Sequence, residues 1–170
     1  MNLRRSFALC MAGLAAVATL SACGFDYPTD RINNITAGAN YRDGTVNILN
    51  AAVVSKQANS GTFIATFVNN NQTDAVTLQS MSGDNTAIGQ VTVPPIRIPP
   101  NGLVNLANKG GIPVNGTFVG GNFVTLSFQF SDGSSATMEV PVVADTPHSQ
   151  WAGLDISTPS PATGSPSPTS

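Results

Sequence analysis

The stretch NFVTLSFQFSDGSSATMEVPVV, residues 122–143, carries the clearest structural signal in the chain. In its first part, residues 122–130, apolar side chains alternate with Thr, Ser and Gln, and this period of two is typical of a strand with one buried and one wet face. SDGSS, residues 131–135, is a short turn, and residues 136–143 then alternate again. The inward positions are Val124, Leu126, Phe128, Phe130, Met138, Val140 and Val142. The pattern predicts an antiparallel β-hairpin.

Similar but shorter signals precede this hairpin. Further strands are predicted at residues 45–55, 61–70, 74–81, 87–93 and 103–107. The proline-rich segment PPIRIPPNG, residues 94–102, cannot lie in a central strand, because proline lacks the N–H donor, so it is expected at a sheet edge or in a crossover between sheets. No stretch keeps a 3.6-residue period. We therefore predict an all-β fold, a single antiparallel β-sandwich over residues 45–155.

The N-terminal segment predicts export. Arg4 and Arg5 precede residues 7–20, which are apolar or small, uncharged and too short for a helix that crosses a membrane. Leu20-Ser21-Ala22-Cys23 matches the bacterial lipobox, in which the cysteine thiol receives a diacylglyceryl group and the peptide is cut before it. Residues 1–22 are therefore predicted as a lipoprotein signal peptide and Cys23 as the lipidation site. The alternative is a chance cysteine in an ordinary signal peptide.

A diacylated Cys23 would anchor the protein to the outer face of the cytoplasmic membrane, since two acyl chains hold stably where one does not. Residues 23–44 are polar and turn-rich and are predicted to be a disordered spacer. Residues 156–170 contain chiefly Ser, Thr, Pro, Gly and Ala, and are predicted to be a disordered tail, or alternatively a wall-spanning or glycosylated stalk. The Arg4-Arg5 pair also resembles a twin-arginine export signal, so the twin-arginine route is an alternative to the general Sec route.

Composition excludes some partners. Removal of residues 1–22 leaves five basic and nine acidic residues, a formal net charge of −4, so no basic patch suggests nucleic acid. Charged residues make up only 9% of the chain, far below the ~25% of typical domains. The second cysteine, Cys10, lies in the predicted signal peptide, so the mature chain has no disulfide and its fold must hold by packing.

No set of residues suggests catalysis. His148 is the single histidine and follows the last predicted strand, where it is expected to be exposed polar surface. Asp145 is close to it, but no G-x-S-x-G turn presents a serine nucleophile. No cluster has the spacing of a zinc site. Trp151 is expected to fold back over the sandwich as a lid, with an exposed anchor for a partner as the alternative. We predict that the protein is not an enzyme and has no cofactor.

Three weak motifs carry a family resemblance over residues 45–143. They are Val68-Asn69-Asn70, where a strand ends in a polar turn; Ile98-Pro99-Pro100-Asn101-Gly102; and Val140-Pro141-Val142, which closes the hairpin. In these the chain resembles the actinobacterial LpqE-like lipoproteins and, more distantly, the PCu(A)C copper chaperones. The resemblance implies an Ig-like or cupredoxin-like sandwich.

The resemblance also implies a place for copper. The chaperones bind Cu(I) through two histidines and two methionines, and soft thioether with imidazole suits that ion. The corresponding stretches here are residues 83–93 and 110–116, where Pro113 and Asn115 replace His and Met. Only Met81, Met138 and His148 remain as possible ligands in the mature chain, so no metal-site residue is predicted. We expect a non-catalytic envelope lipoprotein that binds an envelope protein or cell-wall component. The alternative is a copper metallochaperone-like protein with an altered site.

Overall fold

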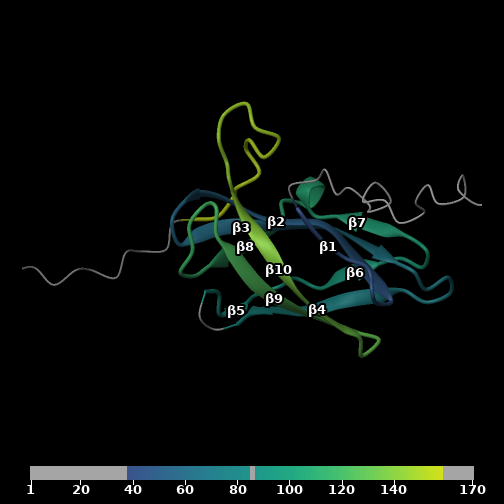
Figure 1. Cartoon of the computed structure of the whole chain (residues 1–170). Helices are drawn as coiled ribbons and strands as arrows, with labels where there is room; N and C mark the ends of the chain where they lie inside the picture. The colour runs from purple at the N-terminus through teal and green to yellow at the C-terminus, as the bar shows by residue number, and fades with distance from the viewer. Residues whose placement is uncertain (1–37, 85–86, 159–170) are drawn as a thin grey trace, which may run out of the picture. The chain divides into compact units, whose positions relative to one another are not determined.

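The computed structural model describes residues 38–84 and 87–158 of the chain (Figure 1). The strands are β1 (Ala39–Tyr41), β2 (Val46–Gln57), β3 (Ser60–Asn69), β4 (Val76–Gly83), β5 (Gln90–Val91), β6 (Ile96–Ile98), β7 (Leu103–Asn105), β8 (Ile112–Asn115), β9 (Phe123–Phe130) and β10 (Ser135–Ala144). One 3-10 helical turn, η2 (Ala107–Lys109), follows β7. No helix among the described residues is long and apolar enough to cross a membrane. The all-β prediction is therefore confirmed.

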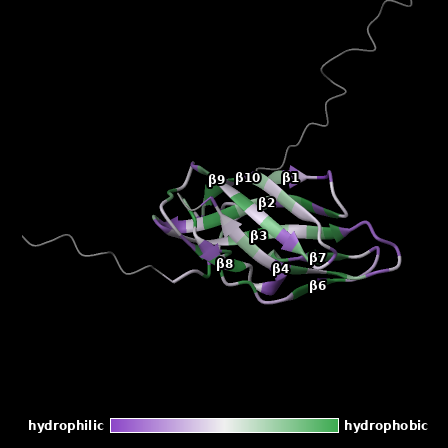
Figure 2. Cartoon of the chain, turned by 90° about the horizontal axis from the view of Figure 1, so that it is seen from below, coloured by the Kyte–Doolittle hydropathy of each residue, from purple (hydrophilic) through white to green (hydrophobic). Residues whose placement is uncertain are grey.

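The strands form two layers joined through β10. The first layer holds β1, β2, β3, β7 and β8, and the second holds β4, β5, β6, β9 and β10. The predicted hairpin is present, because β9 and β10 pair antiparallel from Ser135 opposite Gln129 to Pro141 opposite Phe123. Hydrophobic residues alternate along the strands, and hydrophilic residues gather at the turns (Figure 2).

One part of the topology corrects the prediction. Val142–Ala144 at the end of β10 pairs parallel with Val53–Ser55 of β2, so the sheet is mixed rather than purely antiparallel. The change occurs next to Pro141, where β10 leaves β9 and crosses to the first layer. Hydrophobic alternation records which face of a strand is buried and not the direction of its neighbour, so the sequence pattern could not show this pairing.

Two short strands lie where none was predicted. β1 occupies residues within the predicted spacer, 23–44, and pairs antiparallel with β2, so regular structure begins before the predicted boundary. β8 contains Pro113 and pairs only with β3, an edge position that tolerates a proline. The segment at 94–102 also follows its prediction, because β6 is a three-residue edge strand on β4.

The core between the layers contains the predicted inward residues, with Met138 only partly buried against it, and also Ile112 and Val114 of the unpredicted strand β8. Phe63, Phe67, Leu78, Leu126 and Phe128 are fully buried. The Phe128 ring lies 5.4 Å from the Phe63 ring and 6.1 Å from the Phe67 ring, so aromatic contacts connect β9 to β3 across the interface. Met81 is also fully buried, and its irregular spacing from Leu78 reflects a register shift in β4.

A buried amide fixes the chain crossing between the layers. The Asn69 side chain, 1% exposed, donates to the carbonyl oxygens of Asp74 at 2.8 Å and Pro99 at 3.2 Å, and accepts from the Asn71 N–H at 2.9 Å. Asn69 and Pro99 belong to two of the motifs that carry the family resemblance. The structure thus gives these motifs a structural role, which is to hold the turn between β6 and β7 against the end of β3.

Candidate functional site

Several predicted features lie outside the described residues. These are the signal peptide at 1–22, the lipidation site Cys23, most of the spacer and the tail beyond residue 158. The lipid anchor therefore remains a prediction from the lipobox.

The three possible copper ligands do not converge. Met81 is in the core on β4, whereas Met138 is half-buried on β10, two strands away across β9. His148 is exposed and follows the far end of β10. Ala144 lies six positions after Met138 along the strand, a length of about 20 Å. A site that uses all three side chains is therefore incompatible with this fold.

The two stretches that the resemblance pairs around copper do meet. Ile88 forms a bridge with Gly116, and the Thr117 N–H donates to the Ala87 carbonyl at 2.6 Å. An added Cβ at Gly116 would lie 1.8 Å from the Ala87 carbonyl oxygen, so only glycine permits this approach.

A pocket of about 330 Å³ lies where these stretches meet, and we call it the β5–β8 pocket. It is lined by Gln90, Val91, Thr92, Pro113, Val114 and Asn115. Amide and hydroxyl groups there can donate and accept hydrogen bonds, but none is a thioether, imidazole or thiolate, so the residues present do not fit Cu(I). Within residues 38–84 and 87–158, no group of three or more His, Cys, Asp or Glu could hold a metal ion.

A second candidate region is built by the segment that follows β10. Residues 145–158, here called the C-terminal strap, loop away from the end of β10 and return to the first layer (Figure 1). Asp155 holds the returning segment against β2 and β3. Its Oδ1 accepts from the Thr62 hydroxyl at 3.0 Å and its Oδ2 from the Lys56 N–H at 2.8 Å, while the Ile156 N–H donates to Thr62 Oγ1 at 2.9 Å.

The two carboxylates of the strap, Asp145 and Asp155, have pKa values below the ordinary value. Burial opposes ionisation of Asp155, but hydrogen bonds from Ser157, Lys56 and Thr62 outweigh it and hold its pKa below the ordinary value. Burial likewise opposes ionisation of Asp145. The N–H groups of Gly153 and Asp155 and the Lys56 ammonium, 3.6 Å away, outweigh it and lower the pKa of Asp145. Asp145 is thus engaged within the strap and is not paired with His148 in a catalytic arrangement.

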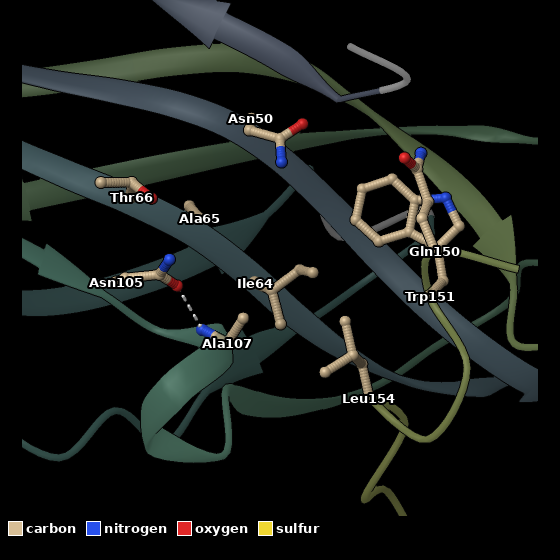
Figure 3. A pocket seen from close by; sticks show the side chains of 9 residues that line it. All are labelled: Asn50, Ile64, Ala65, Thr66, Asn105, Ala107, Gln150, Trp151 and Leu154. Atoms are coloured by element: carbon tan, nitrogen blue, oxygen red, sulfur yellow. Dashed lines mark hydrogen bonds between the residues drawn. The ribbon is translucent and has the colours of Figure 1, made fainter.

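Trp151 packs as the predicted lid. It is 8% exposed and joins Ala52, Val54 and Ile64 in a small apolar cluster on the outer face of β2 and β3. Figure 3 shows Trp151 and Leu154 reaching over this face beside Ile64. They border a pocket of about 170 Å³ whose polar lining comes from Asn50, Thr66, Asn105 and Gln150. Because the indole is mostly covered, its face is not free for a partner.

The sequence reasoning missed the attachment of the strap. Asp155 and its partners Lys56 and Thr62 are separated by more than 90 residues, so no local periodicity connects them. One signal was present: Ala51–Val54 is a continuous apolar run in β2, and such a run is typical of a strand buried on both faces.

Comparison with known proteins supports the fold. No protein-family model matches the chain, and no curated protein matches it. Among solved structures, the copper-bound PCuAC domain from PmoF2 and the apo PmoF2 PCuAC domain each align with a TM-score of 0.50 and 14% identity over 62% of this chain, covering 98% and 95% of their own lengths. The apo PCuAC domain from PmoF1 aligns with a TM-score of 0.49 and 16% identity, over 62% of this chain and 99% of its own. The chain is thus distantly similar in fold to PCuAC domains.

Proposed function

We propose that the protein is an exported lipoprotein, anchored by a diacylglyceryl group on Cys23 to the outer face of the cytoplasmic membrane. Its sandwich acts as a non-catalytic binding module for an envelope protein or a cell-wall component. The lipobox supports the anchor, and the motifs quoted above support a place among the actinobacterial LpqE-like lipoproteins. The proposal does not depend on the similarity in fold, because one fold supports many functions.

One observation carries the choice of a binding role over copper transport. In the β5–β8 pocket, the segments that the resemblance associates with copper are close together, yet their polar side chains are those of Gln90, Thr92 and Asn115. These neutral groups suit recognition of a polar, uncharged surface such as peptide amides or sugar hydroxyls. The alternative, a copper metallochaperone-like protein with an altered site, has only the fold similarity in its favour.

A Cu(I) competition titration separates the two roles. The chain from residue 23 onward, with Cys23→Ser so that it stays unacylated and brings no thiol, is titrated beside the same chain with His148→Ala. We expect no stoichiometric binding in either. Tight one-to-one binding that His148→Ala abolishes would overturn the proposal in favour of copper transport.

The anchor is tested separately in an actinobacterial host. The full chain should partition into the detergent phase, and its Cys23→Ala variant should not. Crosslinking in intact cells then identifies the envelope partner of the anchored form, with Gln90→Ala and Asn115→Ala in the β5–β8 pocket expected to weaken capture. Equal partitioning of the wild-type chain and Cys23→Ala would contradict the anchor.

A further inference from the structure

The sandwich is open along one side. β6 and β7 are consecutive strands joined by the short turn at residues 99–102, yet β6 pairs with β4 in the second layer and β7 pairs with β3 in the first. They diverge from the turn that Asn69 holds in place, and both views show them on the same side of the domain (Figures 1 and 2). Within the described residues no backbone ladder joins β6 to β7, so a cleft remains between their layers.

This cleft is a pocket of about 320 Å³ lined by apolar residues and two cations, here called the β6–β7 cleft. It is lined by Pro94, Pro95, Ile96, Arg97, Val104, Leu106, Lys109 and Gly111. Two of these lining residues, Val104 and Leu106, are buried residues of the main core. At roughly 30 Å³ for a water-sized group, the volume accommodates about ten heavy atoms.

Two cations border the same cleft. The described residues contain four Lys and Arg side chains, those of Arg42, Lys56, Arg97 and Lys109, and two of the four line this pocket. The Lys56 side chain is paired with Asp145, whereas the side chains of Arg97 and Lys109 make no hydrogen bond or ion pair with any described residue. Among the residues that the structure describes, no carboxylate lines the cleft. The predicted mature chain has a net charge of −4, whereas the charge around this cleft is positive.

We infer that the β6–β7 cleft binds an amphipathic anion, with a short aliphatic chain between the layers and a carboxylate or phosphate at Arg97 and Lys109. An apolar pocket with a few convergent polar groups is the usual form of a small-ligand site. The aliphatic part would cover Ile96, Val104 and Leu106, and the anionic head would supply the partner that both cations lack. Charge-assisted hydrogen bonds from a guanidinium are short and strong, which favours Arg97 as the principal contact. This site rests on the proposed binding function and gives it a ligand class.

The test is a titration of the Cys23→Ser chain with decanoate below its micellar concentration, followed by amide chemical shifts. Shifts should be confined to residues 96–97 and 104–111, since Pro94 and Pro95 have no amide N–H. Decyltrimethylammonium, with the same chain and the opposite charge, should bind at least about tenfold more weakly, a difference of about 1.4 kcal/mol. Equal affinity for the two amphiphiles would overturn the inference.

Variants localise the head group. Arg97→Gln and Lys109→Gln should each weaken decanoate binding about threefold to tenfold, while Arg97→Lys should retain part of the affinity. Arg42→Gln is the matched control, since it removes one exposed positive charge away from the cleft and should leave affinity unchanged. An equal loss in Arg42→Gln would show general charge attraction and contradict a built site.

Two further measurements ask whether the head group can be a phosphate and whether the cleft contacts a membrane surface instead of a free amphiphile. Decyl phosphate should bind at the same residues as decanoate. Vesicles of anionic phospholipid should not compete with decanoate if the ligand is a free amphiphile, and competition would reassign the cleft to membrane contact. Failure of all amphiphile binding would remove this inference only, because the Cu(I) titration and the partitioning of Cys23→Ala test the proposed function independently.

Discussion

The two faces of the β2–β3 pair are both apolar but are covered in different ways. The inner face packs against the second layer, where Phe63 and Phe67 meet Phe128. The outer face, with Val54 and Ile64, is covered chiefly by Trp151 of the C-terminal strap. The inner contact is one continuous core, whereas the outer one depends on a single aromatic side chain and the bonds around Asp155. We therefore expect the outer cluster, although it is buried, to lie outside the cooperative core.

The two clusters are therefore expected to respond differently to stress. Segments held by few apolar contacts open locally with free energies below that of global unfolding. We expect the strap to detach while the sandwich stays folded, because its bonds to Lys56 and Thr62 lie on the outside of the first layer. The following changes test that contrast, beginning with the largest expected effect.

Phe128→Ala should destabilise the whole domain. The ring touches both Phe63 and Phe67 in the core, so its loss leaves a cavity between the layers that costs about 3–5 kcal/mol in unfolding free energy. Urea denaturation followed by circular dichroism measures the change. Phe123→Ala is the matched control, since that ring is 66% exposed and its removal should cost no more than about 0.5 kcal/mol. Equal losses in the two variants would show that the interface between layers is not the core.

Trp151→Ala should release the strap with a smaller global effect. We expect a loss of about 1–3 kcal/mol, because the outer cluster is small and the freed strap exposes Val54 and Ile64 without opening the main core. Hydrogen exchange should accelerate at Lys56 and Ile156, whose N–H groups bond across the strap, and stay slow in β9. Ile156→Ala, at a residue 54% exposed on the same segment, is the control. Faster exchange throughout β9 would contradict local release.

Acid should loosen the strap before it unfolds the sandwich. The pKa values of Asp145 and Asp155 are lowered in the folded chain, so the stability that they supply is present above the ordinary aspartate pKa of about 3.9 and is lost as pH falls through the lower folded values. Trp151 is the single tryptophan, so a red shift of its emission below about pH 4 reports the release.

Asp155→Asn should weaken the attachment of the strap already at neutral pH, by about 1–3 kcal/mol in free energy. The substitution removes the charged carboxylate whose oxygens accept hydrogen bonds from Thr62 and Lys56. It should also remove the part of the pH dependence of the emission that Asp155 supplies, while the part from Asp145 stays. An unchanged acid transition in Asp155→Asn would assign the response to another group.

Much of the architecture was accessible from short-range pattern. Alternation over residues 122–143 predicted the β9–β10 hairpin and its inward side chains, and similar patterns located β2, β3 and β4. The prolines of residues 94–102 correctly predicted an edge segment. The strands β1 and β8 were missed, because three or four residues carry too little periodicity and Pro113 argues against a strand.

The candidate sites were harder to predict from the sequence. The exposed His148 and the covered Trp151 agree with the sequence predictions. The sequence could not reveal the β6–β7 cleft. In the amino-acid sequence Arg97 and Lys109 are two isolated cations. They line the same pocket only because two consecutive strands diverge.

The amino-acid sequence by itself determined which faces of the strands are buried, and it carries the lipobox that predicts an anchor at Cys23. Both are local: one is a period of two and the other a run of four residues. Only the tertiary structure decided that β10 pairs parallel with β2, that the strap returns to Lys56 and Thr62, and that β6 and β7 part to leave a cleft. Hydrophobic periodicity shows that a face is covered but not what covers it, and contacts between residues far apart in the sequence leave no trace in that periodicity.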